Sequence, residues 1–121
     1  MHHQVKSIRP FLGAKNYEVS RAFYHDLGFQ ENVISATMSY FCYDSLGFYL
    51  QKAYVQDWVD NTMVFMEVVD VNLFWNQLLA LNLTSKYENV KLVPIVTLDW
   101  GKEFFVHDPS GILWHFGAFV K

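Results

Sequence analysis

The chain has 121 residues, of which 52% are apolar and 18% aromatic, and its formal net charge is −3. This length and composition predict one domain, residues 1–121, with a real hydrophobic core, and exclude a disordered chain. The lysine and arginine residues form no basic stripe, so we expect no nucleic-acid partner. No apolar run is long enough to span a bilayer, so we expect no membrane partner. No secretory leader pattern is visible and the single cysteine excludes an internal disulfide, so we expect a cytoplasmic protein.

The first half of the chain predicts one strand, one helix and then three strands. Asn16 is a typical N-cap residue, apolar residues follow it at helical spacing, and Gly28 stands where a helix end favours a residue that tolerates positive φ. The predicted helix covers 17–27, and the predicted strands cover about 6–12, 29–35, 38–43 and 47–53.

The second half predicts the same order of elements. Asp70 is its N-cap residue, and Asn82 takes the place of Gly28 at the end of the helix. The predicted helix covers 71–82, and the predicted strands cover about 62–69, 90–97, 102–107 and 112–119. The stretch 53–61 is expected only to link the two halves.

These two halves form an internal repeat with two anchors. Residues 16–29 match residues 70–83 at an offset of 54 (70 − 16), and the turn at 44–47 matches the turn at 108–111 at an offset of 64 (108 − 44). We therefore expect two diverged copies of one unit, about 6–53 and about 62–119. A four-stranded sheet with one helix on one face leaves its other face free, and two such sheets would curl around a cleft suited to a ligand.

Four stretches resemble a known superfamily. The first two stretches are FYHDLGF at 23–29 and DPSG at 108–111. The other two are QDWVDNT at 56–62 and WGKEF at 100–104. The WGKEF stretch is followed by the DPSG turn and then by His115. Together with the doubled order of elements they resemble the vicinal oxygen chelate superfamily, which includes glyoxalase I, extradiol dioxygenases, fosfomycin-resistance enzymes and bleomycin-resistance proteins. The last two stretches resemble the bleomycin-resistance branch.

The resemblance implies a fold and an assembly. The fold is α+β, with two βαβββ units of the glyoxalase/bleomycin-resistance type whose mixed sheets curl round a cleft. Chains of this length in the superfamily typically pair as homodimers, and the exposed sheet edges of each unit favour such pairing. We therefore expect a homodimer with its pockets at the interface.

The resemblance also indicates where a catalytic metal would lie. Counting seven residues before each helix cap and four after each turn glycine gives Arg9, Met63, Gln51 and His115. Arginine has no lone pair to donate, a methionine thioether is a soft ligand, and a catalytic site needs about three protein ligands. We therefore expect no metal, no other cofactor and no catalytic residue, so the protein is predicted not to be an enzyme.

The predicted function is that of a bleomycin-resistance-like protein, which confers antibiotic resistance by sequestering a small aromatic or cationic molecule without catalysis. Trp100 stands beside a glycine in a polar turn and is predicted to be a stacking platform. The predicted ligand-binding residues are Arg9, Met38, Gln51, Met63, Trp100, Glu103 and His115. The alternative function is a metal-dependent lyase or dioxygenase whose ligands lie elsewhere.

Several residues keep two interpretations. Arg9 is either a solvated edge residue or a pocket cation, and His115 is either a partly buried, satisfied histidine or a polar group lining the pocket. Glu103 pairs with a cation or caps the loop, and a general base is the less favoured role. Trp58 is expected at an interface and Cys42 in the interior. The phenylalanines expected in the core are Phe11, Phe65, Phe104 and Phe116.

Overall fold

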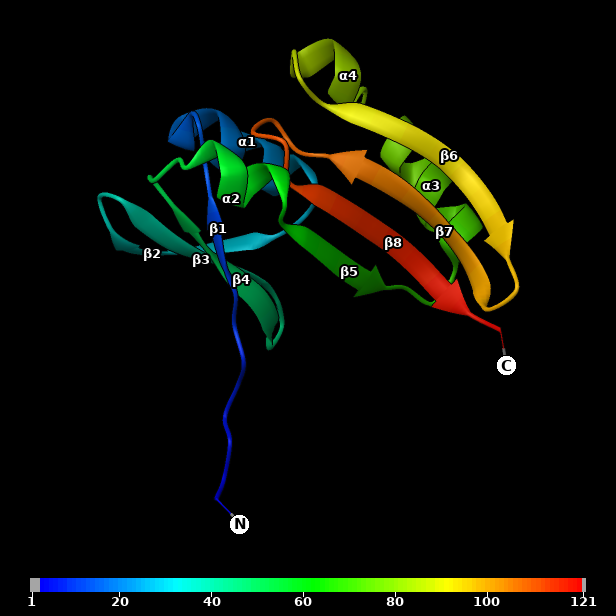
Figure 1. The fold of residues 1–121 in the computed structure, drawn as a ribbon, viewed down its shortest axis with the longest axis horizontal. Coiled ribbons are helices and arrows are strands. Elements are labelled where there is room, and N and C mark those ends of the chain that lie inside the picture. The colour runs from blue at the N-terminus through cyan, green and yellow to red at the C-terminus, as the bar shows by residue number, and fades with distance from the viewer. Residues whose placement is uncertain (1–2, 121) are drawn as a thin grey trace.

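The computed structural model describes residues 3–120, which form two four-stranded sheets, each with a helix packed on one face (Figure 1). The elements of the first unit and the connection are β1 (Phe11–Gly13), α1 (Tyr17–Asp26), β2 (Gln30–Ser35), β3 (Met38–Tyr43), β4 (Leu46–Gln51) and α2 (Gln56–Asp60). Those of the second unit are β5 (Met63–Glu67), α3 (Val71–Leu79), α4 (Leu83–Lys86), β6 (Lys91–Leu98), β7 (Gly101–His107) and β8 (Leu113–Phe119).

Both sheets have the same topology. The strand order is β1-β4-β3-β2 in the first and β5-β8-β7-β6 in the second. The first strand of each unit pairs in parallel with the last, and the remaining pairs are antiparallel. The prediction of two βαβββ units with mixed sheets is therefore confirmed.

The two main helices begin where the sequence predicts. The side chain of Asn16 accepts a hydrogen bond from the Val19 amide at 3.2 Å, and Asp70 caps α3 through Leu73 at 3.0 Å. Gly28 and Asn82 both have positive φ, at 98° and 53°, as expected for residues that end a helix. Each helix then turns its apolar side onto the sheet of its own unit.

Aromatic rings make up much of the core beneath α1 and α3. Tyr24 of α1 packs against Phe41 and Phe48 of the first sheet, while Phe104 and Phe116 of the second sheet stack at 5.0 Å beneath α3. Cys42 is buried as expected, and so are Phe104 and Phe116. The placement of Phe11 and Phe65 in the core was wrong, because they are 57% and 43% exposed on the faces that no helix covers.

A buried hydrogen-bond network joins the two units. The fully buried carboxylate of Asp108, in the loop before β8, accepts a hydrogen bond from the Tyr24 hydroxyl at 2.6 Å, and this hydroxyl accepts one from the Trp114 indole at 2.9 Å. Asp108 also accepts hydrogen bonds from the amides of residues 110, 111 and 112. Burial raises the pKa of Asp108, and the hydrogen bonds from Tyr24 and the three amides oppose that shift. The network therefore fixes helix α1 of one unit to the last turn of the other.

The first strand is shorter than predicted. Only Phe11–Gly13 pair with β4, and the segment before them runs away from the sheets (Figure 1). The chain joins the sheet at Pro10, whose carbonyl accepts a hydrogen bond from the Tyr49 amide at 2.9 Å, while proline itself has no amide hydrogen to donate. Ile8 is consequently 90% exposed instead of lying in a strand.

The link between the units and the end of α3 each contain a short helix that the sequence analysis missed. Residues 56–60 of the link form α2, in which Trp58 is 73% exposed. The predicted helix 71–82 ends at Leu79, and Asn82 begins the separate helix α4. No helix within residues 3–120 has both the length and the apolar character needed to cross a membrane.

The predicted match between the two turns is wrong by two residues. Gly111 has a φ of 108° in its turn, whereas Gly47 lies inside β4 and the preceding hairpin turns at Asp44, which has a φ of 50°. The ladders pair Phe11 with Tyr49 and Phe65 with His115, so the last strands correspond at an offset of 66 (115 − 49). The counterpart of His115 is therefore Tyr49 and not Gln51.

Candidate functional site

Each sheet has one face that no helix of its own unit covers, and we call these the open faces of unit one and unit two. Along β4, Phe48 and Leu50 face α1 and are buried, whereas the alternating Tyr49 and Gln51 lie on the opposite side. Along β8, Trp114 is buried and His115 lies on the opposite side, which confirms that these two neighbours point to different faces. The open faces are therefore the places where side chains can meet a ligand.

The open face of unit one carries a row of three rings. Phe11, Tyr49 and Tyr40 are ladder partners across β1, β4 and β3, with ring centroids 5.0 Å and 5.5 Å apart. Arg9 lies over this row, with its guanidinium carbon 3.8 Å from the centroid of the Tyr40 ring. The row is thus an aromatic surface with one cation stacked on it.

Arg9 is held in place by the tyrosines and not by an acidic partner. Its Nη1 donates a hydrogen bond to the Tyr49 hydroxyl at 3.0 Å, and this bond is the main reason that the pKa of Arg9 is raised. Its Nε is buried and has no hydrogen-bond partner within residues 3–120. Arg9 is therefore held against the rings by Tyr40 and Tyr49, which fits a pocket cation better than a solvated edge residue.

Met38 and Gln51 occupy the next position of the same face, where they are ladder partners. Gln51 also lines a hollow of about 290 Å³ beside α2, together with Phe11 and Trp58. Three of the seven predicted ligand residues, namely Arg9, Met38 and Gln51, therefore gather on unit one.

The open face of unit two carries a matching row around a histidine. His115 lies between its ladder partners Phe65 and Phe105, with ring centroids 6.3 Å and 4.8 Å from its own. Its Nδ1 lies 2.8 Å from the carboxylate of Glu103, which is only 7% exposed. Within the described chain, Glu103 thus contacts the His115 ring and pairs with no lysine or arginine.

Trp100 and Met63 lie at the margins of this second face. The Trp100 ring packs at 5.2 Å from Phe119 and 6.1 Å from Phe65, so the indole lies beside the aromatic row in the turn between β6 and β7. Met63 starts β5 and is 66% exposed. Four predicted ligand residues therefore gather on unit two, away from the three on unit one.

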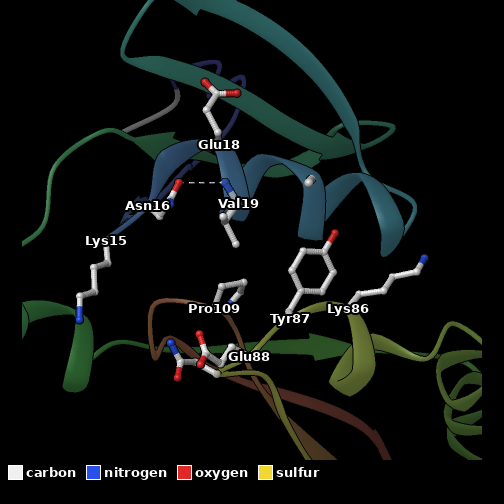
Figure 2. Close-up of a pocket in the computed structure, with 10 residues that line it drawn as sticks. Lys15, Asn16, Glu18, Val19, Lys86, Tyr87, Glu88 and Pro109 are labelled. Carbon is white, nitrogen blue, oxygen red and sulfur yellow. Dashed lines mark hydrogen bonds between the residues drawn. The ribbon is translucent and has the colours of Figure 1, made fainter.

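Two larger hollows lie elsewhere. One of about 590 Å³ runs between the N-terminal segment, β4 and β5, where Phe65 is part of its wall. The other, of about 720 Å³, lies between α1 and the segment around α4, with Lys15 and Lys86 toward its two ends (Figure 2). Two of its polar groups already have partners, since Asn16 caps α1 and the Tyr87 hydroxyl donates to Asp26 at 2.6 Å. This second hollow is therefore best described as a junction between the units.

Metal ligands are sparse on both faces. Within residues 3–120, no three side chains of histidine, cysteine, aspartate or glutamate come together in a way that could hold a metal ion. The position of His115 in unit two is taken in unit one by Tyr49, and that of Glu103 by Met38. The His115–Glu103 pair is therefore the nearest approach to a metal site on the open faces.

Most of the aromatic residues on both faces were not predicted there. Phe11 and Phe65 were expected in the core, and Tyr49 and Phe105 were given no role, whereas the rings of the strand that holds Tyr40 were expected on both faces, one in the core and the other open to a pocket. The period-two alternation along β4 and β8 was a usable signal, because residues that alternate with buried ones must lie on the opposite face.

Comparisons with known proteins give structural relatives only. No protein-family description matches the sequence, and no curated protein matches it. Among solved structures, a bleomycin resistance determinant encoded on the transposon Tn5 superposes with a TM-score of 0.79 at 15% identity, covering 97% of this chain and 100% of the other.

Two further structures extend this likeness. The bleomycin-binding protein of Streptomyces verticillus, solved with copper(II)-bleomycin, superposes with a TM-score of 0.78 at 22% identity, covering 97% of this chain and 100% of its own. A lactoylglutathione lyase from Agrobacterium tumefaciens superposes with a TM-score of 0.69 at 13% identity, covering 95% of each chain. The chain therefore has the fold that bleomycin-resistance proteins and glyoxalase-family proteins share, as the resemblance to the vicinal oxygen chelate superfamily implied.

Proposed function

We propose that this protein binds and sequesters a small, partly aromatic or cationic molecule at its open sheet faces, without catalysis. The observation that carries the proposal is the pair of ring rows, Phe11–Tyr49–Tyr40 and Phe65–His115–Phe105, on faces that neither α1 nor α3 covers. Binding sites for small molecules are typically apolar and aromatic surfaces with a few polar groups that fix orientation. Both open faces have this composition.

The polar groups near each row are suited to orienting a ligand. On unit one, Arg9 offers a cation beside the rings. On unit two, the His115–Glu103 pair lies within the row, and Trp100 adds an indole at its edge. Offset stacking of a flat ligand ring on Trp100 would add to the binding free energy, beyond the contribution of the apolar area that the contact buries.

We propose further that two copies of the chain form the complete site. The predicted ligand residues divide between the open faces of the two units. These faces also expose large apolar side chains, since Phe11, Met63 and Phe65 are 57%, 66% and 43% exposed, and exposed apolar patches of this kind mark surfaces that bind a partner. In a two-fold dimer, the open face of unit one of one copy would lie against that of unit two of the other. The cleft between them would enclose a ligand on two sides, which supports a homodimer with two equivalent pockets. The cytoplasm is the proposed location.

The solved structures suggest the first ligand to test. Two of the similar proteins were solved as bleomycin-binding proteins in complex with bleomycin or copper(II)-bleomycin. Bleomycin combines flat aromatic rings with cationic groups, and the net charge of −3 on this chain favours a cationic partner. A role in antibiotic resistance follows if such a drug binds tightly.

The second candidate function is a metal-dependent lyase or dioxygenase. The specific observation in its favour is the His115–Glu103 pair, two groups of the kind that hold divalent metals, on a fold that a lactoylglutathione lyase shares. A catalytic metal needs about three protein ligands and one open position. The pair on its own is therefore one ligand short.

The test is calorimetric titration of the full chain with metal-free bleomycin and with copper(II)-bleomycin, together with sedimentation equilibrium of the free protein. We expect saturable binding at one bleomycin per chain and a dimer in the absence of ligand. The double variant Phe65→Ala/Trp100→Ala, which removes two rings of the proposed site, should remain folded and lose bleomycin binding. Absence of binding by either form of bleomycin would count against a bleomycin-like ligand, and a monomer would count against the shared cleft.

A further inference from the structure

The His115 ring makes one directional contact that determines its chemistry. Its Nδ1 lies 2.8 Å from Glu103 Oε1, and this is its only hydrogen bond within residues 3–120. An ionised carboxylate only accepts hydrogen bonds, so Nδ1 must carry the proton. In a neutral imidazole the other nitrogen, Nε2, is then an acceptor. The side chain of His115 is 22% exposed, against 9% for that of Glu103, so the histidine is the member of the pair that a ligand can reach.

The surroundings of the pair favour this arrangement. The ladder partner of Glu103 is Gly117, and a Cβ at Gly117 would lie 2.8 Å from the Phe65 ring. The missing side chain leaves room for the Phe65 ring beside His115. Phe65 and Phe105 flank the imidazole on both sides. The ring is therefore held between two phenylalanines and oriented by one carboxylate.

Unit one shows that the fold does not require this pair. The positions that correspond to His115, Glu103 and Gly117 are occupied there by Tyr49, Met38 and Gln51. The sheet of unit one has the same strand order with these residues. A half-buried histidine and a buried carboxylate on an open face are costly to keep for packing alone. The pair thus points to recognition.

We infer that Glu103 is a positioning residue that holds His115 in the tautomer protonated at Nδ1, so that Nε2 accepts a hydrogen bond from an N–H or O–H group on a flat aromatic ligand. The inference rests on the proposed function and adds the class of ligand group that unit two recognises. Glu103 itself does not contact the ligand, and it acts through the histidine. Carboxylates that bond the far nitrogen of a histidine are known to fix both its tautomer and its orientation.

The first experiment reads the tautomer directly in the free protein. ¹⁵N-detected spectra of the histidine rings are recorded at pH 8, above the ordinary titration range of imidazole, and His115 is assigned from the signal that His115→Gln removes. We expect a protonated Nδ1 and an unprotonated Nε2, with a mixture of tautomers in Glu103→Gln. His107→Gln, on the same face, is the control and should leave the His115 signals unchanged. A protonated Nε2 in the wild-type protein would overturn the inference.

The second experiment uses two neutral probes of the same shape. Indole carries an N–H donor where benzofuran carries an oxygen without a donor, so electrostatic attraction by the protein's net charge affects both equally. We expect indole to shift the Nε2 resonance and to bind about 2- to 10-fold more tightly than benzofuran, and we expect Glu103→Gln to bring the two affinities close together. Equal binding of both probes, or an Nε2 signal that neither probe moves, contradicts the inference.

These outcomes separate the inference from the proposed function. If bleomycin fails to bind while indole is preferred over benzofuran through Nε2, bleomycin is the wrong ligand and the role of Glu103 stands. If bleomycin binds with the same affinity to the wild-type protein and to Glu103→Gln, and the probes are not distinguished, the role of Glu103 is wrong and the binding function stands.

Discussion

Removing one oxygen atom at Tyr24 should destabilise the whole domain. In Tyr24→Phe the ring remains, but two hydrogen bonds are lost, one of 2.6 Å to Asp108 and one of 2.9 Å from Trp114. Both partners are buried, at 0% and 2% exposure, so water cannot replace the lost hydroxyl without opening the core. The Asp108 carboxylate keeps its three backbone donors, and the Trp114 N–H is left with no partner within the described chain.

The expected size of this loss follows from the two atoms left without a partner in the described chain, Asp108 Oδ2 and Trp114 Nε1, because the three backbone amides all donate to Asp108 Oδ1. A buried polar group that loses its partner costs about 1–3 kcal/mol, so the two together should lower the free energy of unfolding by about 3 kcal/mol. With a urea m-value of about 1.5 kcal/mol/M for a domain of this size, the midpoint of unfolding should fall by about 2 M. The loss should appear as one cooperative transition, because Tyr24 joins unit one to Asp108 and Trp114 of unit two.

The assay is urea unfolding at pH 7, followed by tryptophan fluorescence and by far-ultraviolet circular dichroism. The matched control is Tyr43→Phe, which also removes one hydroxyl but loses only the bond to the Leu27 carbonyl at the end of α1 within the same unit. That change should cost about 1 kcal/mol or less. If Tyr24→Phe unfolds within about 0.5 M urea of the wild-type protein, or no earlier than Tyr43→Phe, the network does not hold the units together as argued.

Three further results are expected. Trp100→Ala should cost about 1–3 kcal/mol of affinity for any ligand confirmed by calorimetry, whereas Trp58→Ala should leave that affinity unchanged, and equal effects would contradict stacking on Trp100. Burial would raise the pKa of Glu31, but hydrogen bonds from Arg21 and Ser39 lower this pKa from 4.5 to about 2. The ionised Glu31 side chain therefore stabilises the folded state at pH values above 4.5, and this stabilisation is lost as the pH falls toward 2. The free energy of unfolding of Glu31→Gln should therefore be about 1–2 kcal/mol lower than that of the wild-type protein at pH 7 and similar to it at pH 2. Urea unfolding at both pH values measures this difference, and a difference that is the same at pH 7 and pH 2 would contradict the prediction. Titration of metal-stripped protein lacking residues 1–3 with Mn²⁺, Fe²⁺, Ni²⁺ and Zn²⁺ should show no tight site, and one tight site per chain would favour the lyase or dioxygenase.

Local sequence patterns accounted for most of the secondary structure. The N-caps Asn16 and Asp70 and the helix-end residues Gly28 and Asn82 all lie where predicted, because capping and positive φ depend on a few neighbouring atoms. The repeat also predicted the order of elements along each unit, whereas the spatial order of the strands came only from the tertiary structure. The short helices α2 and α4 were missed because four or five residues carry too little periodicity.

The register of the repeat needed the tertiary structure. A glycine in a turn and a glycine in a strand look alike in sequence, so Gly47 was matched with Gly111 and the counterpart of His115 was misplaced by two residues. Only the ladder shows that Tyr49 corresponds to His115. A shift of two residues keeps a side chain on the same face, which is why Gln51 still lies on the open face of unit one.

The sequence by itself determined the two βαβββ units, the residues at which their main helices begin and a set of polar residues beside aromatic ones. Only the tertiary structure decided which rings are core and which are exposed, because Phe11 and Phe104 have the same chemistry and differ only in whether a helix covers their face. It also brought Glu103 of β7 to His115 of β8, and Arg9 over Tyr40 of β3. The geometry of both contacts is created by strand pairing, which no local pattern encodes.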